Sequence, residues 1–289
     1  MSRKLIFGGS LAIVYLVWGS SYFATHWALQ AFPPLLLTGL RGLTAGSAMF
    51  FVLRLRGEPL PPPIEWRNTA AVGMLMSLSG GIVAVGVQSV PTSTAAILVA
   101  TVPIFASLIA VLCGVRVHWR EWLGIVVGFI GICLLNEGGL TGISAGNLAI
   151  LLGALSWALG SHLSAQLRLP ANVIMSTSLQ IMLGGTVMLS YAWWTGERLA
   201  GAGINIGSLS GFAYLSLFGT LLCFCAYNYL ARHGSMAIAN SYAYISPLIA
   251  VLLGAILLSE KVTPQTLLAM GIIILAVGLV FWSHYHRPR

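Results

Sequence analysis

Long apolar stretches alternate with short polar connections along the whole chain. Most of these blocks hold about 20 residues, enough for a helix to cross the ~30 Å hydrocarbon core of a bilayer. A single soluble core could not bury so many of them. The pattern therefore predicts an all-α, polytopic membrane protein with ten transmembrane helices. The blocks are residues 6–29, 35–53, 69–87, 93–113, 121–136, 147–167, 172–194, 208–231, 236–258 and 265–283.

The connections between the blocks are too short to hold a soluble domain. The longest are residues 54–68, which include three consecutive prolines, and residues 195–207, which are rich in glycine. The basic start Met1–Leu5 is typical of a signal peptide, but the apolar run behind it is too long and carries several aromatic residues. We therefore expect a retained first helix.

The composition agrees with a membrane protein and excludes several kinds of chemistry. Charged residues make up 7% of the chain, against about 25% in soluble domains. The acidic residues are all glutamate, and the absence of aspartate excludes an aspartyl-phosphate pump, an Asp-rich diphosphate site and a Walker B motif. The sequence also lacks a P-loop, an HExxH motif and a nucleotide-binding glycine fingerprint. We therefore expect no enzyme activity, no metal, no cofactor and no use of ATP.

The net charge is +8. The distribution of this charge along the chain fits a membrane topology rather than a nucleic-acid-binding surface. With the N-terminus inside and the blocks alternating, eleven of the fourteen Lys and Arg residues lie on the inner side. Only Arg198 and Lys261 lie outside, and Arg41 lies within a span. Because cytoplasmic loops carry the excess of Lys and Arg, this asymmetry predicts an even number of spans with both termini in the cytoplasm.

Landmarks recur in the same order in the two halves of the chain. Pro103 and Pro247 are 144 positions apart, and Trp18 and Trp157 are 139 positions apart. Each half then holds five helices, and because five is odd the second half enters the membrane from the other side. Inverted repeats of this kind are typical of secondary transporters, whose solute site lies near the midplane. The predicted halves are residues 1–137 and 146–289.

Several short runs along the chain resemble a known group of carriers. In the first half they are Leu16–Ser21, Pro34, Leu40–Gly42 and Thr101–Phe105; in the second half they are Ala226–Leu230, Ile245–Leu248 and Leu258–Thr263. Together they resemble the drug/metabolite transporter superfamily with paired EamA domains, and within it most of all the YddG-type exporters of aromatic and other amino acids. This resemblance implies a ten-helix inverted-repeat carrier with a central cavity, exporting metabolites from a bacterial inner membrane.

The resemblance has one departure. Residues 114–118 of the first half stand where the second half carries the family's Glu260, so no shared role for that glutamate is expected in the first half.

Two stripes of semi-polar and aromatic residues, one in each half, are candidates for the solute site. They are Trp18, Ser21, Tyr22 and Thr25 in the first half, and Trp157, Gly160, Ser161 and Ser164 in the second half. Each set is spaced i, i+3, i+4, i+7, which places its members on one helical face. We expect them to line a shared cavity near the midplane. The alternative is that small and hydroxyl residues merely allow the helices to pack closely.

Three other blocks add further candidates. We expect Tyr227 and Thr101 to contribute to the solute site, together with Asn240 and Tyr244, which with Pro247 should share one helical face. Proline cannot donate to the carbonyl four residues back. Pro247 and its partner Pro103 are therefore predicted hinges, the alternative for each being a static kink.

Two ionisable groups lie inside predicted spans, where such groups are functional candidates by default. His162 could bind solute or titrate, but it lies about 140° around the helix from Trp157, so it could simply bond to a neighbouring helix. Arg41 could pair with Glu137 or Glu260 as a structural element, or it could bind a carboxylate. We favour the structural role.

No carboxylate lies deep in any predicted span, so a proton-exchanging group of the usual kind is missing. We therefore expect solute to move down its own gradient, by facilitated diffusion or exchange, through alternating access. The expected solute is a small metabolite, above all an amino acid, and the expected unit is a monomer. The alternatives are a drug or sugar exporter, then a membrane-embedded enzyme, a channel or a scaffold.

Overall fold

The computed structural model describes residues 3–114, 119–135, 144–234 and 236–285, and in these parts the chain is helical with no strand. The predicted all-α fold class is therefore confirmed. The α-helices are α1 (Arg3–Ala28), α2 (Pro34–Leu55), α3 (Pro63–Val87), α4 (Thr92–Val99), α5 (Val102–Leu112), α6 (Trp119–Leu135), α7 (Ala145–Gln166), α8 (Val173–Trp194), α9 (Ile206–Tyr214), α10 (Cys223–His233), α11 (Met236–Ala239), α12 (Tyr242–Leu257) and α13 (Pro264–Tyr285). A short 3₁₀ helix, η1 (Gly201–Gly203), precedes α9, and a π-helical segment, η2 (Leu215–Leu222), joins α9 to α10.

Seven helical stretches in the described part of the chain are long and apolar enough to cross a bilayer. They are Lys4–Ala28, Pro34–Leu55, Pro63–Val87, Thr92–Leu112, Ala145–Gln166, Val173–Trp194 and Ile206–His233. Three shorter apolar stretches, Trp122–Gly131, Ile245–Leu257 and Pro264–Ala276, overlap the remaining predicted blocks. The count of ten spans and the inversion of the second half remain predictions.

Two of the predicted spans are broken helices. Between α4 and α5 the helix is interrupted at Ala100 and Thr101, so Pro103 lies in the first turn of α5. A proline in that position loses no helical hydrogen bond, because its N–H would be unpaired in any case. Pro247, by contrast, lies inside α12, and the break between α11 and α12 precedes it at Asn240 and Ser241.

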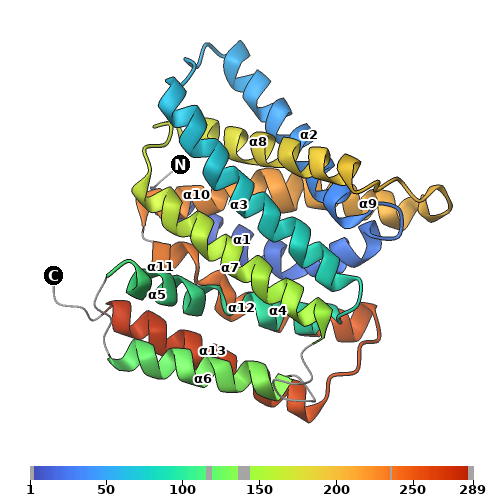
Figure 1. Ribbon diagram of the computed structural model, residues 1–289, viewed down its shortest axis with the longest axis vertical. Helices are drawn as coiled ribbons and strands as arrows, with labels where there is room; N and C mark the ends of the chain where they lie inside the picture. Colours follow the sequence, from blue (N-terminus) through green and yellow to red (C-terminus); the bar gives the residue numbers. More distant parts are fainter. Residues whose placement is uncertain (1–2, 115–118, 136–143, 235, 286–289) are drawn as a thin grey trace.

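The helices of the two halves pack against one another in related pairs. Helix α2 packs on α8, and α6 packs on α13 along the lower edge of Figure 1. Helix α3 packs on α7 while α10 packs on α1, and α1 packs on α12 while α7 packs on α4 and α5. If each helix is replaced by its counterpart in the other half, each of these contacts becomes itself or another of the contacts just named. The interface between the halves is therefore extensive and runs through the middle of the molecule.

Glycines allow the closest of these contacts. A Cβ added to Gly42 of α2 would lie 2.8 Å from the carbonyl oxygen of Ile181 in α8. A Cβ added to Gly73 of α3 would lie 2.2 Å from the carbonyl oxygen of Gln180. Neither distance leaves room for a side chain, so α2 and α3 approach the backbone of α8 as closely as small residues permit in membrane helices.

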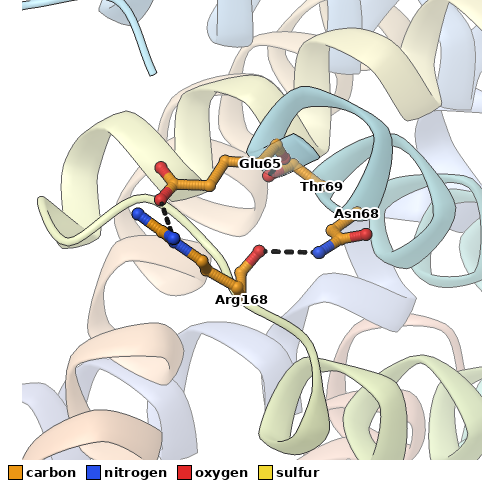
Figure 2. A network of polar contacts seen from close by, with 4 residues as sticks. All are labelled: Glu65, Asn68, Thr69 and Arg168. Carbon is orange, nitrogen blue, oxygen red and sulfur yellow. Dashed lines mark hydrogen bonds and ion pairs between the residues drawn. The ribbon is translucent and has the colours of Figure 1, made fainter. Parts of the chain in front are cut away.

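The molecule has two ends, which we call the N-terminal face, where α1 begins, and the opposite face, where α1 ends and α2 begins (Figure 1, N-terminus at the left). At the N-terminal face, Arg168 of the α7–α8 connection forms an ion pair with Glu65 of α3, with 3.0 Å between Nε and Oε1. Asn68 donates to the Arg168 carbonyl at 2.9 Å (Figure 2). This network ties the start of α3 to the second half.

Two further glutamates of the second half tie the opposite face by capping helices of the first half. Glu197 accepts hydrogen bonds from the backbone N–H groups of Leu35 and Leu36 at the start of α2. The Glu260 carboxylate accepts four hydrogen bonds at the start of α4, from the backbone N–H and side-chain hydroxyl groups of Thr92 and Ser93, at 2.7–3.1 Å. Carboxylates suit these positions because unpaired N–H groups and the positive end of the helix dipole meet there.

The Glu260 cap has a consequence for its ionisation. Burial of the carboxyl raises its pKa, but the hydrogen bonds from Ser93 and Thr92 outweigh burial, so that the pKa lies below its ordinary value of 4.5. The preceding residue, Ser259, adopts a left-handed backbone with φ of 53°. Such a conformation is unfavourable for a residue with a side chain and persists where its surroundings hold it.

Candidate functional site

A cavity of about 120 Å³ lies between the two halves. Helices α1, α2 and α3 supply most of its wall, and α4, α7, η2, α10 and α12 contribute one residue each. The aromatic lining residues are Trp18, Tyr22, Trp157, Phe224 and Tyr242. The polar ones include Ser21, Thr25, Thr38, Arg41 and Ser79. Among the described residues that line it there is one cation and no carboxylate.

Trp18 is the centre of an aromatic cluster at one end of the cavity. Its ring centroid lies 5.2 Å from that of Trp157, 5.4 Å from that of Tyr227 and 4.7 Å from that of Tyr242. The indole N–H of Trp18 donates to the carbonyl oxygen of Gly219, in the π-helical segment η2, at 3.1 Å. Trp18 therefore joins α1 to four elements of the second half, α7, η2, α10 and α12.

A chain of buried hydrogen bonds lies next to this aromatic cluster. The Tyr227 hydroxyl donates to Asn240 Oδ1 at 3.0 Å and lies 2.8 Å from the Ser161 hydroxyl. Nearer the N-terminal face, the hydroxyl groups of Tyr15 and Ser241 lie 2.7 Å apart. These bonds join α1, α7, α10 and the break between α11 and α12. The cavity is therefore closed toward the N-terminal face by rings and by polar contacts between the halves.

A second pocket lies toward the opposite face. That pocket is lined by His26, Leu29 and Gln30 of the α1 end and by Val87 and Gln88 of the α3 end. Val87 also lines the central cavity, so the two spaces adjoin. Aromatic and polar contacts therefore pack the side of the central cavity toward the N-terminal face, whereas a second pocket lies on the side toward the opposite face.

The sequence-predicted site residues fall into distinct groups. Trp18, Ser21, Tyr22 and Trp157 line the cavity. Ser161, Tyr227 and Asn240 form the buried chain behind the aromatic cluster. Thr101 is fully buried at the α4–α5 break, where its hydroxyl donates to the Leu98 carbonyl at 2.7 Å. The Tyr244 side chain lies outside the described residues.

His162 lies apart from the cavity lining. Its Nε2 accepts from the Gln166 side-chain amide at 3.0 Å and lies 3.5 Å from the Cys113 sulfur. Both partners are at the N-terminal-face ends of their helices, α7 and α5. The geometry places His162 in a local side-chain contact between helices, one of the two roles considered from the sequence.

One sequence expectation is wrong, and one of the two partners suggested for Arg41 is excluded. Asn240 does not share a helical face with Tyr244 and Pro247, because the helix breaks at Asn240 and α12 begins only at Tyr242. Arg41 does not pair with Glu260, whose carboxylate is occupied by Thr92 and Ser93. Its other suggested partner, Glu137, lies outside the described residues.

Several lining residues were missed from the sequence. Tyr242 escaped because the helical register was counted through the break. Ser79 and Gly80 of α3 line the cavity. The run of small residues in the middle of that block could have indicated a helix face that packs closely or borders a cavity. Thr38 was detectable too, because it stands one helical turn before Arg41 and shares its face.

Comparisons with known proteins agree with this architecture. Residues 6–137 and 144–282 each match the EamA-like transporter family. The chain is 40% identical over 286 residues to YedA of Escherichia coli (strain K12), described as an uncharacterized inner membrane transporter, covering 97% of this chain and 92% of YedA. It is 29% identical over 272 residues to protein PecM of Dickeya dadantii (strain 3937), covering 91% and 88%. A solved crystal structure with 18% sequence identity has the same fold, with a TM-score of 0.66 and 96% of both chains covered.

The two family matches together span nearly the whole chain, and YedA aligns along almost its full length. The apolar helices provide the multi-pass membrane architecture that such a protein requires. The chain therefore belongs to the EamA-like transporter family, within the drug/metabolite transporter superfamily, and is a membrane transporter.

Proposed function

We propose that this transporter exports small metabolites, above all amino acids including aromatic ones, by alternating access through the central cavity. The observation that carries the proposal is the cavity wall, in which Trp18 of one half and Trp157 of the other meet edge to face. Indole and phenol rings stack on flat or apolar side chains and attract cationic groups such as an ammonium. The sequence resemblance to YddG-type exporters supports the same class of solute.

The orientation of the cavity in the membrane follows from the proposed topology. The excess of Lys and Arg at the N-terminal face supports a cytoplasmic location for both termini in the bacterial inner membrane. In that orientation the cavity is closed toward the cytoplasm and approaches the outside, as in an outward-facing state. The related packing of the two halves supports a second, inward-facing state, reached when the halves exchange conformations.

The proposed driving force is the solute's own gradient. A proton-coupled carrier needs a group that exchanges protons for solute, and in a membrane that group is commonly a buried carboxylate or histidine. Among the described residues, neither lines the central cavity, and His162 lies outside it. Facilitated diffusion or exchange requires no such group.

The test is solute uptake by purified protein reconstituted in liposomes, over a panel of amino acids, with and without a pH gradient. Amino-acid-specific flux that reaches equilibrium without a pH gradient supports the proposal. If an amphipathic drug or a sugar moves and no amino acid does, the solute class is wrong although the chain remains a carrier. Uphill movement driven by an acid pulse would contradict the proposed driving force.

A further inference from the structure

Arg41 is a charged side chain inside a membrane helix, and the described residues give it no partner. It is the eighth residue of α2, about 10 Å along the helix axis from Pro34. No carboxylate among the described residues lies within ion-pair distance of its guanidinium, and no described residue accepts a hydrogen bond from it. A cation in this position is costly unless a counter-ion neutralises it or water solvates it. The guanidinium faces the cavity, where a solute could do so.

Gly80 of α3, which also lines the cavity, leaves space for the Arg41 guanidinium. A Cβ added to Gly80 of α3 would lie 2.9 Å from Arg41 Nη2, closer than such atoms approach in proteins. Any larger residue there would push the guanidinium away from its position. The absence of a side chain at Gly80 therefore leaves room for the guanidinium in its present position at the cavity.

A second unpaired polar group stands beside it. Thr38 precedes Arg41 by one helical turn, lines the same cavity and is 4% exposed, yet its buried hydroxyl oxygen has no hydrogen-bond partner among the described residues. Buried polar groups in native proteins nearly always have partners, so an orphan that faces a cavity points to a ligand or water. A hydroxyl and a guanidinium one turn apart can donate together to the two oxygens of a carboxylate.

The facing helix α1 offers the complementary group. Ser21 and Thr25 line the cavity, but each donates its hydroxyl proton to a carbonyl of its own helix, at 2.7 and 2.8 Å. Their oxygens are left as acceptors. The cavity therefore has donors on α2, acceptors on α1 and aromatic rings at its closed end.

We propose that Arg41 and Thr38 bind the carboxylate of the transported solute, and that the cavity selects molecules with one carboxylate and an apolar body. The Ser21 and Thr25 oxygens then accept from an ammonium where the solute has one, as in an amino acid. A cationic amphiphile without a carboxylate is excluded, because the lone charge of the cavity repels it. This inference rests on the proposed transport function, whose solute class it narrows.

The experiment is equilibrium binding to the purified full-length protein with three probes of one shape: L-phenylalanine, its carboxamide and 3-phenylpropionate. The wild type is expected to bind both acids and to bind the carboxamide roughly 10- to 100-fold more weakly, because a charge-assisted contact is lost. Arg41→Gln is expected to weaken binding of the acids by a similar factor. Arg41→Lys, which keeps the charge but loses the planar fork, is expected to recover part of it.

Matched variants separate binding from folding. Gly80→Ala keeps Arg41 but displaces its guanidinium and is expected to weaken acid binding, whereas Gly271→Ala, where an added Cβ meets nothing within 4 Å, is expected to leave binding unchanged. Arg56→Gln removes an exposed arginine at the far end of the same helix as a charge control. If Arg41→Gln does not fold, Gly80→Ala still carries the test.

The outcomes distinguish this inference from the proposed amino-acid function. Arg41-dependent binding of 3-phenylpropionate without binding of L-phenylalanine would sustain the carboxylate site and remove the amino-acid function. Transport of L-phenylalanine that survives both Arg41→Gln and Gly80→Ala would sustain the function and overturn the site. Equal binding of the acid and the carboxamide by the wild type would also overturn it.

Discussion

Replacing Glu260 by glutamine removes a negative charge from the start of α4 without changing the shape of the side chain. In the wild type, each carboxylate oxygen accepts from one backbone N–H and one hydroxyl, four bonds in all. Glutamine keeps one acceptor oxygen and turns an NH₂ group toward the other pair of donors. One backbone N–H then loses its acceptor and faces another donor, and the neighbouring hydroxyl must turn to accept from the NH₂ group.

The expected loss in the free energy of unfolding is about 1–2 kcal/mol. Removing a side chain that caps a helix N-terminus costs ~1 kcal/mol, and the lost charge at the helix dipole adds roughly 0.3–1 kcal/mol. The carboxylate is only half-buried, so solvent screening keeps the total at the lower end of what four such bonds would suggest.

The effect must also depend on pH in a defined direction. Because the folded-state pKa of Glu260 lies below its ordinary value of 4.5, the stabilisation is fully present above about pH 4.5. It is lost as the pH falls through the lowered folded-state pKa. The wild type and Glu260→Gln should therefore differ most at neutral pH and converge in acid.

Thermal unfolding of the detergent-purified protein, followed by tryptophan fluorescence, measures this difference. Glu260→Gln is expected to lower Tm by a few degrees at pH 7. Glu58→Gln is the matched control, since its carboxylate makes no hydrogen bond with the described residues. An unchanged Tm for Glu260→Gln at pH 7, or a gap that widens in acid, would refute the account of the cap.

Three further substitutions test other contacts by the same unfolding assay and by flux. Tyr227→Phe should cost about 1–3 kcal/mol, because it leaves the buried Asn240 oxygen unpaired; no loss would mean that the buried chain contributes nothing. Arg168→Gln should cost less than ~1 kcal/mol, since the arginine side chain is 73% exposed, and a larger loss would contradict this reading of the Glu65 pair. Trp18→Phe removes the bond to Gly219 and should slow solute flux more than it lowers Tm; normal flux would exclude a role for the indole in transport.

Much of the fold could be predicted from the apolar blocks. Helices or broken helices occupy the predicted blocks, because apolar length and backbone satisfaction leave a membrane segment few alternatives. The meeting of Trp18 and Trp157 in one cavity was also foreseeable, since each stands at the same position of its half. Periodicity and internal repetition report these features directly.

The remaining features depend on contacts that periodicity does not encode. The break at Asn240 shifts the helical register, so Tyr242 rather than a residue counted through the break joins the aromatic cluster. Glu260 finds its partners on α4, 167 and 168 positions away in the sequence. Arg41 was expected to pair with a glutamate, and only the packing shows that Glu260 is already occupied and that Gly80 leaves the guanidinium space at the cavity.

Counterflow in proteoliposomes tests the central claim most directly. Vesicles loaded with unlabelled L-phenylalanine are diluted into a trace of labelled L-phenylalanine, with no pH gradient, for the wild type and for Trp18→Ala. A carrier that alternates access through the cavity predicts a transient accumulation of label in wild-type vesicles and a strongly reduced one in the variant. A wild type that gives no accumulation with any carboxylate-bearing amino acid, or a variant equal to it, would contradict the account.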